Sequence, residues 1–256
     1  MKYKYLDTTI ISLLFGVCWQ LSSGRFLLKS NEIESELKDD KHGIKMGKVF
    51  HGCDDAMNDL DIDWDGSPLN YTCYNPQHPL PVLKHITSIE TCDPIPDGYY
   101  PQHHCMGDPI VYNTTLPTYG DHRPLWPVFG EYIFVPKQRW LHNIEHGAVV
   151  MLYHPCANKV LVSRLRALVT SCMRKHVITA YNLMDSERPL ALIAWGCRLT
   201  MNTVDTDTVV SFIKRKSMKG PEGPYPKEGQ YKHLLVKLAE PPHGSDYNDS
   251  KICPHF

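Results

Sequence analysis

The sequence predicts an α+β fold, a mixed β-sheet with two helices packed on it, plus a loop-rich, disulfide-stapled N-terminal extension. In the second half of the chain, short apolar runs rich in β-branched residues alternate with two amphipathic segments of helical period. Between residues 51 and 108, four cysteines are spread among prolines, glycines and aspartates with little periodicity. A chain of 256 residues that is 42% hydrophobic can form one sizeable core.

The first 24 residues are typical of a secretory signal peptide. Lys2 and Lys4 precede an apolar run over 10–19, and small residues follow it. This run is too short for a stable membrane span, and a buried helix or a signal anchor is the alternative interpretation. Residues 25–50 are polar and charged, so we expect a loose leader.

The cysteine content indicates an oxidising compartment. Loss of the signal peptide removes Cys18 and leaves eight cysteines, an even number that suits disulfides. The four cysteines of the extension allow three pairings among themselves, and their spacing does not choose between them. Zinc is the competing use of these cysteines, but no CxxC pair is present. The disulfide candidates are Cys53, Cys73, Cys92, Cys105, Cys156, Cys172, Cys197 and Cys253.

Three glycosylation sequons agree with passage through the secretory pathway, at Asn70, Asn113 and Asn248. We therefore expect a secreted or lumenal glycoprotein. No later apolar run approaches membrane-spanning length, so we expect no transmembrane anchor in the mature chain. The net charge of −1 and the absence of a basic stripe argue against nucleic-acid binding.

The core domain is expected over residues 109–240, with a C-terminal tail over 241–256. A helix over 158–175, with Asn158 as its N-cap, and a second helix from about Asp205 are expected to pack on the sheet. The strands are expected at 131–135, 148–153, 177–181, 190–195 and, as an edge strand, 233–238.

The helix over 158–175 restricts disulfide pairing. Cys156 and Cys172 would lie ~24 Å apart along it, at about 1.5 Å per residue, and could not pair. Cys172 faces the core side of this helix, so we expect its partner to be Cys197 or Cys253.

Polar residues gather just before the strand at 148–153. His142 and His146 lie four apart, a spacing that places both on one face of a helix or of a strand, and we expect them on a turn at the mouth of the sheet. With His122, on another turn, they predict a zinc or copper site with Glu145 as fourth ligand or as a base. Three histidines with an open position would form a water-activating centre.

Asp121 or Asn143 could hold the second ring nitrogen of a ligand histidine. The structural alternative is that the histidines bridge backbone carbonyls while Glu145 accepts a hydrogen bond from a backbone amide or pairs with Arg123 or Arg139.

Other chemistries fit less well. HNIEH resembles HExxH only loosely, because the glutamate stands beside the second histidine. No GxSxG elbow, phosphate-binding loop or CxxC motif occurs. His103 and His104 are adjacent and so should point to different sides, which makes them weaker site candidates.

Several sequence words, in this order, resemble the DUF 3105 family: YNTTLPTYGDHRPLW, FGEY, QRWLHNIEHGAVVMLYHPC, PLALIAWGCRL and GPEG. The resemblance covers about Val111 to Gly223 and implies a shared fold without an established activity. It also implies that the family's polar positions fall on His122, His142, Glu145 and His146. For its vertebrate branch the resemblance implies a membrane span after this domain, and this chain departs from it because no such run occurs before Phe256.

We therefore expect an extracellular interaction or regulatory protein whose partner is an unidentified extracellular or membrane protein. The alternative is a metal-binding protein or a metal-dependent enzyme that uses His122, His142 and His146. The sequence does not decide whether the chain is an enzyme, and no cofactor beyond zinc or copper is expected.

Overall fold

The computed structural model describes residues 36–223, 225 and 227–256. The expected signal peptide, 1–24, and the leader as far as residue 35 lie outside the described residues. The chain divides into two units, 1–40 and 41–256. The described part of the first unit holds a two-residue strand, β1 (Lys38–Asp39), and the features below belong to the second.

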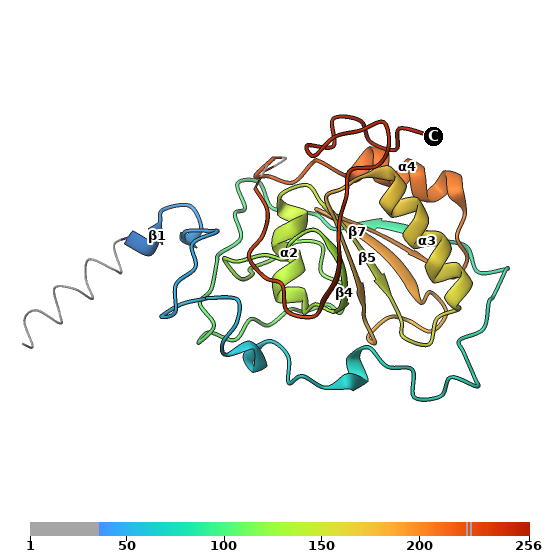
Figure 1. The fold of residues 1–256 in the computed structure, drawn as a ribbon, viewed down its shortest axis with the longest axis horizontal. Helices are drawn as coiled ribbons and strands as arrows, with labels where there is room; N and C mark the ends of the chain where they lie inside the picture. Colours follow the sequence, from blue (N-terminus) through green and yellow to red (C-terminus); the bar gives the residue numbers. More distant parts are fainter. Residues whose placement is uncertain (1–35, 224, 226) are drawn as a thin grey trace, which may run out of the picture. The chain divides into compact units, whose positions relative to one another are not determined.

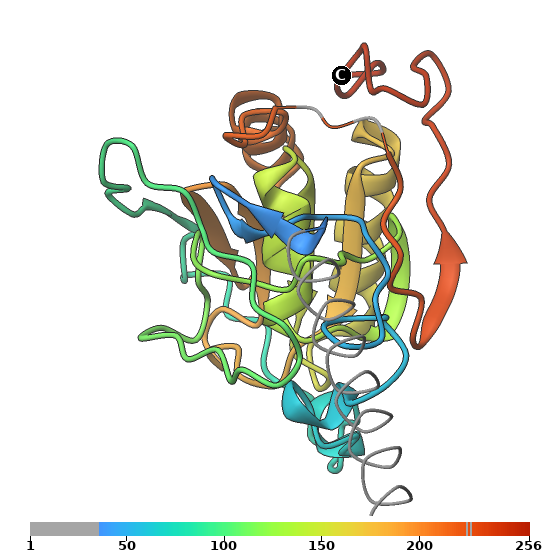
Figure 2. The ribbon, with the colours of Figure 1, turned by 90° about the vertical axis from the view of Figure 1, so that its left-hand side faces the viewer.

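A seven-stranded mixed sheet forms the centre of the second unit, in the order β3-β8-β7-β5-β6-β4-β9. The β5–β6 and β4–β6 pairs are parallel and the other pairs are antiparallel, which confirms the predicted α+β class. Strand β9 lies at one edge, as Figure 2 shows. The strands are β3 (Ile89–Cys92), β4 (Gly130–Phe134), β5 (Val149–Tyr153), β6 (His176–Ala180), β7 (Leu190–Ala194), β8 (Cys197–Met201) and β9 (Leu235–Leu238), with a short β2 (Gly43–Ile44) before them.

Helices cover both faces of this sheet. Helices α3 (Lys159–Cys172) and α4 (Thr206–Lys216) pack on one face, and α2 (Lys137–Glu145) packs on the other (Figure 1). Strand β5 separates the two cores, because its alternate residues point to opposite faces. Val149 and Met151 belong to the core under α3 and α4, and Val150 to the core under α2.

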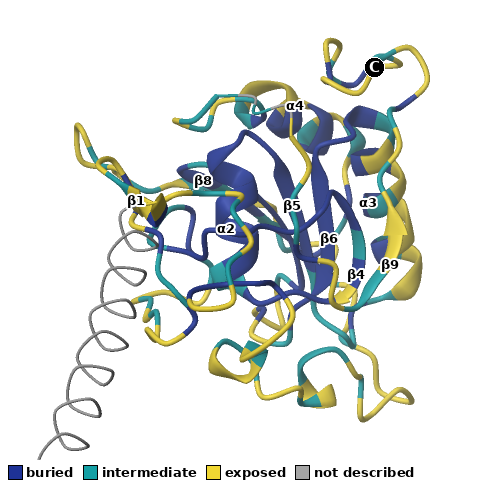
Figure 3. Cartoon of the chain, turned by 60° about the vertical axis from the view of Figure 1, so that its left-hand side comes forward, coloured by how far each residue is buried: buried dark blue, intermediate teal, exposed yellow. Residues whose placement is uncertain are grey.

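Helix α2 corrects the prediction of two helices and of a turn around His142. Pro136 precedes its first residue, where a missing N–H costs nothing. The helix ends at Glu145, and Gly147, the residue after the C-cap His146, lies in the left-handed region at φ 82°. The Gly147 and Ala148 amides donate to the carbonyls of Ile144 and Asn143, which closes a Schellman motif. Every residue from Arg139 to Glu145 is buried (Figure 3).

Disulfides join the extension to the core. The predicted pairing within the extension is right for Cys53–Cys105 only. Its other two cysteines, Cys73 and Cys92, pair with cysteines of the core, and so they tie the loop around residue 73 and strand β3 to the core domain. Cys172 pairs with Cys253, one of its two expected partners. The remaining disulfides are Cys73–Cys156, Cys92–Cys197 and Cys172–Cys253.

The extension contains little regular structure besides β3. Its other elements are two single 3-10 turns, η1 (Leu60–Ile62) and η2 (Pro68–Asn70). Cross-links between distant residues stabilise such a segment by restricting the unfolded chain, by about 4 kcal/mol for loops of this length in the chain-entropy account. Among the described residues, no helix is long and apolar enough to cross a membrane.

Candidate metal centre

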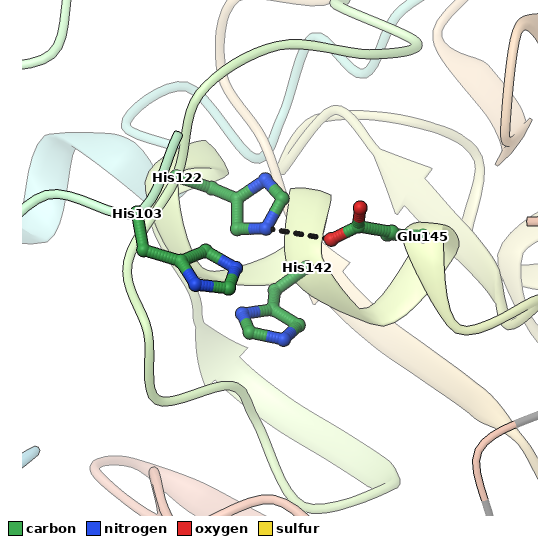
Figure 4. A group of neighbouring side chains, drawn as sticks. All are labelled: His103, His122, His142 and Glu145. Carbon is green, nitrogen blue, oxygen red and sulfur yellow. Dashed lines mark ion pairs between the residues drawn. The ribbon is translucent and has the colours of Figure 1, made fainter. Parts of the chain in front are cut away.

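Three imidazoles and one carboxylate meet between α2 and the loops that cover it. Figure 4 shows His103, His122 and His142 gathered beside Glu145. One donor atom from each residue lies within 4.8 Å of all the others, and all four side chains are buried. We call these four residues the inner group. They could hold a metal ion, for which four ligands at about 2.0 Å in tetrahedral geometry stand ~3.3 Å apart.

Two neighbouring loop segments and one helix position the inner group. The amides of His104 and His122 donate to the carbonyls of His122 and Gln102, so the segments that carry His103 and His122 run side by side. His142 and Glu145 lie three apart on α2 and therefore share a face of the helix.

The second ring nitrogen of each histidine contacts a backbone carbonyl. A carbonyl only accepts hydrogen bonds, so Nδ1 carries the proton and the Nε2 lone pair is left for a ligand. This is the arrangement that fixes the tautomer of metal-bound histidines. The Nδ1···O distances are 2.7 Å for His103–Ile44, 2.9 Å for His122–Gly120 and 2.7 Å for His142–Arg123.

These carbonyls take the role that the sequence suggested for Asp121 and Asn143. The Asp121 carboxylate accepts from the Gln102 amide at 2.8 Å and lies 3.0 Å from His104 Nε2. The Asn143 Nδ2 donates to the Pro127 carbonyl at 2.9 Å. Neither contact holds a histidine of the inner group. The sequence could not show this, because the carbonyls come from loops that meet only in the fold.

The donor atoms of the inner group have no hydrogen-bond partner in the described part of the chain. This holds for Nε2 of each histidine and for both carboxylate oxygens of Glu145. His122 Nε2 and Glu145 Oε2 are 3.0 Å apart, within ion-pair distance but without hydrogen-bond geometry. Buried polar atoms are rarely left unpaired, so the inner group is arranged as though a cation lay among its atoms.

Burial keeps two of the imidazoles neutral. It lowers the pKa of His103 to about 2, with a smaller contribution from the neighbouring His122. The same causes hold the pKa of His142 well below its ordinary value of 6.5. A neutral imidazole is the metal-binding form, so these rings are ready to act as ligands at neutral pH.

Glu145 has none of the partners that the structural alternative offers, because in the described part of the chain neither a backbone amide nor Arg123 or Arg139 donates to its carboxylate. Arg139 forms a buried bidentate pair with Asp54, at 2.5 and 2.9 Å. Arg123 binds Asp63 in the same way, at 2.6 and 2.9 Å. Both arginines therefore hold aspartates of the extension, and the carboxylate of Glu145 is left to the histidines.

His146, a predicted ligand, lies outside the inner group. It is the C-cap residue of α2, and its ring stacks on Tyr225 with centroids 4.8 Å apart. Both of its ring nitrogens are buried without a partner within the described residues, and burial lowers its pKa to about 3. The His146 ring lies beside that of His142, with centroids 4.8 Å apart, but its ring nitrogens are not among the converging donor atoms.

His103 was missed. The expectation that adjacent histidines diverge is correct, since His104 turns to Asp121 while His103 stacks on His142 with centroids 4.8 Å apart and planes at 10°. His103, which the sequence made a weaker candidate, belongs to the inner group, and His104 does not. The sequence did contain a signal for His103. Side chains alternate along an extended segment, so one of any two adjacent histidines points inward.

Comparison with known proteins gives a family without an assigned activity. The family described as "Protein of unknown function (DUF3105)" matches residues 103–230, half of the chain, and this range contains the whole inner group. Tumor protein p53-inducible protein 13 of Rattus norvegicus is 26% identical over 92 residues, 36% of this chain. The chain matches about a quarter (24%) of the length of that relative. No solved structure matches. The chain belongs to the DUF3105 family.

Proposed function

We propose that this chain is a secreted or lumenal metalloprotein whose inner group holds a zinc ion. The single observation that carries the proposal is the set of buried donor atoms without partners, three Nε2 atoms and the Glu145 carboxylate. A carboxylate that is hidden from water and lacks a hydrogen bond costs several kcal/mol unless a cation neutralises it.

The donor set favours zinc. Three imidazole nitrogens and one carboxylate oxygen complete a tetrahedral zinc site. Imidazole also suits copper, so copper is the second metal to be measured. The four disulfides support an oxidising compartment, and the eight cysteines that form them do not compete with the inner group for metal.

A closed centre supports a stabilising role. All four side chains are at most 4% exposed, and a catalytic zinc would need a position open to water. The ion would join helix α2 to the two loop segments that carry His103 and His122. We therefore propose an extracellular interaction or regulatory protein whose fold depends on the inner metal, and whose partner is an extracellular or membrane protein.

Metal analysis of the purified, secreted protein tests the proposal. We expect at least one equivalent of zinc or copper to resist dialysis and to be released on denaturation. X-ray absorption of the protein that holds one equivalent of zinc should show about three imidazoles at ~2.0 Å. His142→Gln should lose the tightly held ion.

The proposal is overturned if the folded protein binds neither metal when each is added in excess. His122 and Glu145 would then form a buried imidazolium–carboxylate pair. Circular dichroism of His142→Gln shows whether the variant is folded, which separates loss of metal from loss of fold. The X-ray absorption spectrum of the wild-type protein tests the site without any variant.

A further inference from the structure

A second cluster of ligand-type side chains adjoins the inner group. One donor atom from each of His42, Glu145 and Glu222 lies within 4.8 Å of the other two. We call these three residues the outer group. His42 is buried, while the side chain of Glu222 is 14% exposed, so this cluster lies closer to solvent than the inner group.

Ring stacking places His42 beside the inner group. Its ring stacks on that of His103, with centroids 4.8 Å apart and planes at 15°, and His103 stacks on His142 in turn. The His103 amide donates to the His42 carbonyl at 2.8 Å, which keeps the two segments together. His42, His103 and His142 therefore form one continuous stack, which joins the outer group to the inner group.

His42 makes a hydrogen bond through each ring nitrogen. Its Nδ1 lies 2.9 Å from the Pro101 carbonyl, and its Nε2 is hydrogen-bonded to Glu222 Oε1 at 2.9 Å. A metal ion bound by His42 Nε2 and Glu222 would take the place of the proton in this second hydrogen bond.

Close backbone contact fixes Glu222 near Glu145. The Met218 amide donates to the Gly147 carbonyl at 2.7 Å, and the chain then crosses the end of α2. A Cβ on Gly220 would stand 1.8 Å from the Glu145 carbonyl oxygen, so only glycine allows this approach.

Glu145 is the member that the two groups share. Both of its carboxylate oxygens lack hydrogen-bond partners in the region that the structure describes, and one faces His122. A carboxylate can bind one metal ion through each oxygen, and paired ions of this kind stand about 3.5–4 Å apart.

We infer that the chain binds a second divalent metal ion, held by His42 and Glu222 and bridged to the first ion by Glu145. This inference rests on the proposed function, because the bridge needs the inner ion. Lys41 binds the same Glu222 oxygen as His42 does, and its side chain is 40% exposed. The second ion would displace this ammonium group into solvent, so metal and Lys41 compete for one carboxylate.

Zinc titration of the protein, after a chelator has removed its bound metal, tests the inference. We expect two equivalents for the wild-type protein and one for Glu222→Gln, with the inner ion retained. Lys41→Gln should keep two equivalents and bind the second at least tenfold more tightly. With Cu²⁺ in both positions, magnetic coupling through the Glu145 bridge should weaken the electron paramagnetic resonance signal, which then accounts for less copper than the protein contains. Glu222→Gln should restore the full signal per bound copper.

The outcomes separate the two proposals. One equivalent in the wild-type protein, unchanged by Glu222→Gln and with an unaltered affinity in Lys41→Gln, overturns the second ion and leaves the first. No binding by the folded wild-type protein overturns both. The Lys41→Gln variant keeps the test decisive if Glu222→Gln does not fold, because the Lys41 side chain is partly exposed.

Discussion

His122 Nε2 lies 3.0 Å from Glu145 Oε2, and both side chains are fully buried. Because His122 donates a hydrogen bond from Nδ1–H to the Gly120 carbonyl, the Nε2 lone pair and a carboxylate oxygen face each other across this distance. The contact is stable only with a proton or a metal ion between the two atoms. The predictions below follow from this relation and from the elements that create it.

Removal of metal should destabilise the protein. An ion that binds only the folded state adds about 4 kcal/mol when its concentration is 1,000 times the dissociation constant. For a domain of this size, that corresponds to a Tm lower by roughly 10 °C after chelation. Differential scanning calorimetry with and without chelator measures the shift, and readdition of zinc should reverse it. An unchanged Tm in protein shown to have lost its metal would contradict the prediction.

The neighbours His103 and His104 offer a matched pair of substitutions. His103→Gln removes a ligand of the inner group and should weaken zinc binding by at least about 100-fold. Loss of a residue that only hydrogen-bonds to a metal ligand already weakens metal binding by about 10–100-fold. His104→Gln changes a side chain that is 34% exposed and paired with Asp121, and affinity should stay within about threefold. Competition with a zinc indicator measures both affinities. Equal losses in the two variants would place the site elsewhere.

Gly220→Ala should disturb the end of α2. The new Cβ would stand 1.8 Å from the Glu145 carbonyl oxygen, so the backbone must move, at a cost of about 2–4 kcal/mol in the free energy of unfolding. Gly107→Ala is the control, because nothing lies within 4 Å of its added Cβ. Urea denaturation of both variants checks the difference, and a Gly220→Ala protein as stable as the control would refute the close approach.

Acid should destabilise the metal-free protein below about pH 6. The folded-state pKa values of His103, His142 and His146 are lowered from 6.5, chiefly by burial. As the pH falls through 6.5, the unfolded chain takes up protons that the folded chain refuses. Stability is therefore present above this range and lost below it, approaching about 4 kcal/mol per pH unit for three histidines.

Urea denaturation in chelator at pH 7, 6 and 5 checks this dependence. The window lies above the ordinary pKa of carboxyl groups, so the histidines dominate it. Equal stability at pH 7 and pH 5 would mean that these rings take up protons as readily in the folded chain as in the unfolded chain.

The three glycosylation sequons should differ in use. Asn113 and Asn248 are exposed. Asn70 is partly buried, and its side chain accepts from Trp64 Nε1 at 2.9 Å and contacts Asn182 at 3.3 Å. We expect glycans at Asn113 and Asn248 and little at Asn70, which peptide mass spectrometry of the secreted protein can measure. Full occupancy at Asn70 alone would contradict this order.

Local patterns predicted the core of the fold well. The helix at Lys159–Cys172 and the strand at Val149–Tyr153 follow from hydrophobic period and from the Asn158 cap, whose side chain accepts from two helix amides. The strands β3 and β8 were missed. Ile89–Cys92 and Cys197–Met201 mix polar with apolar residues, and they are stabilised by pairing with each other, which no local pattern records.

The candidate site could be predicted only in part. His142 and Glu145 belong to one helix, so a short sequence word contains both. His103, His42 and Glu222 come from distant segments that meet through backbone contacts around α2. Their convergence depends on loop packing, on Gly220 and on the disulfides, and none of these leaves a periodic signal.

The disulfide between Cys53 and Cys105 closes a loop of the chain two residues beyond His103, and the last ligand, Glu222, follows 180 residues after His42. A growing polypeptide therefore cannot complete the outer group until residue 222 has emerged, whereas the inner group needs the chain only as far as Glu145. Loading of the second ion would accordingly come later in biogenesis than loading of the first.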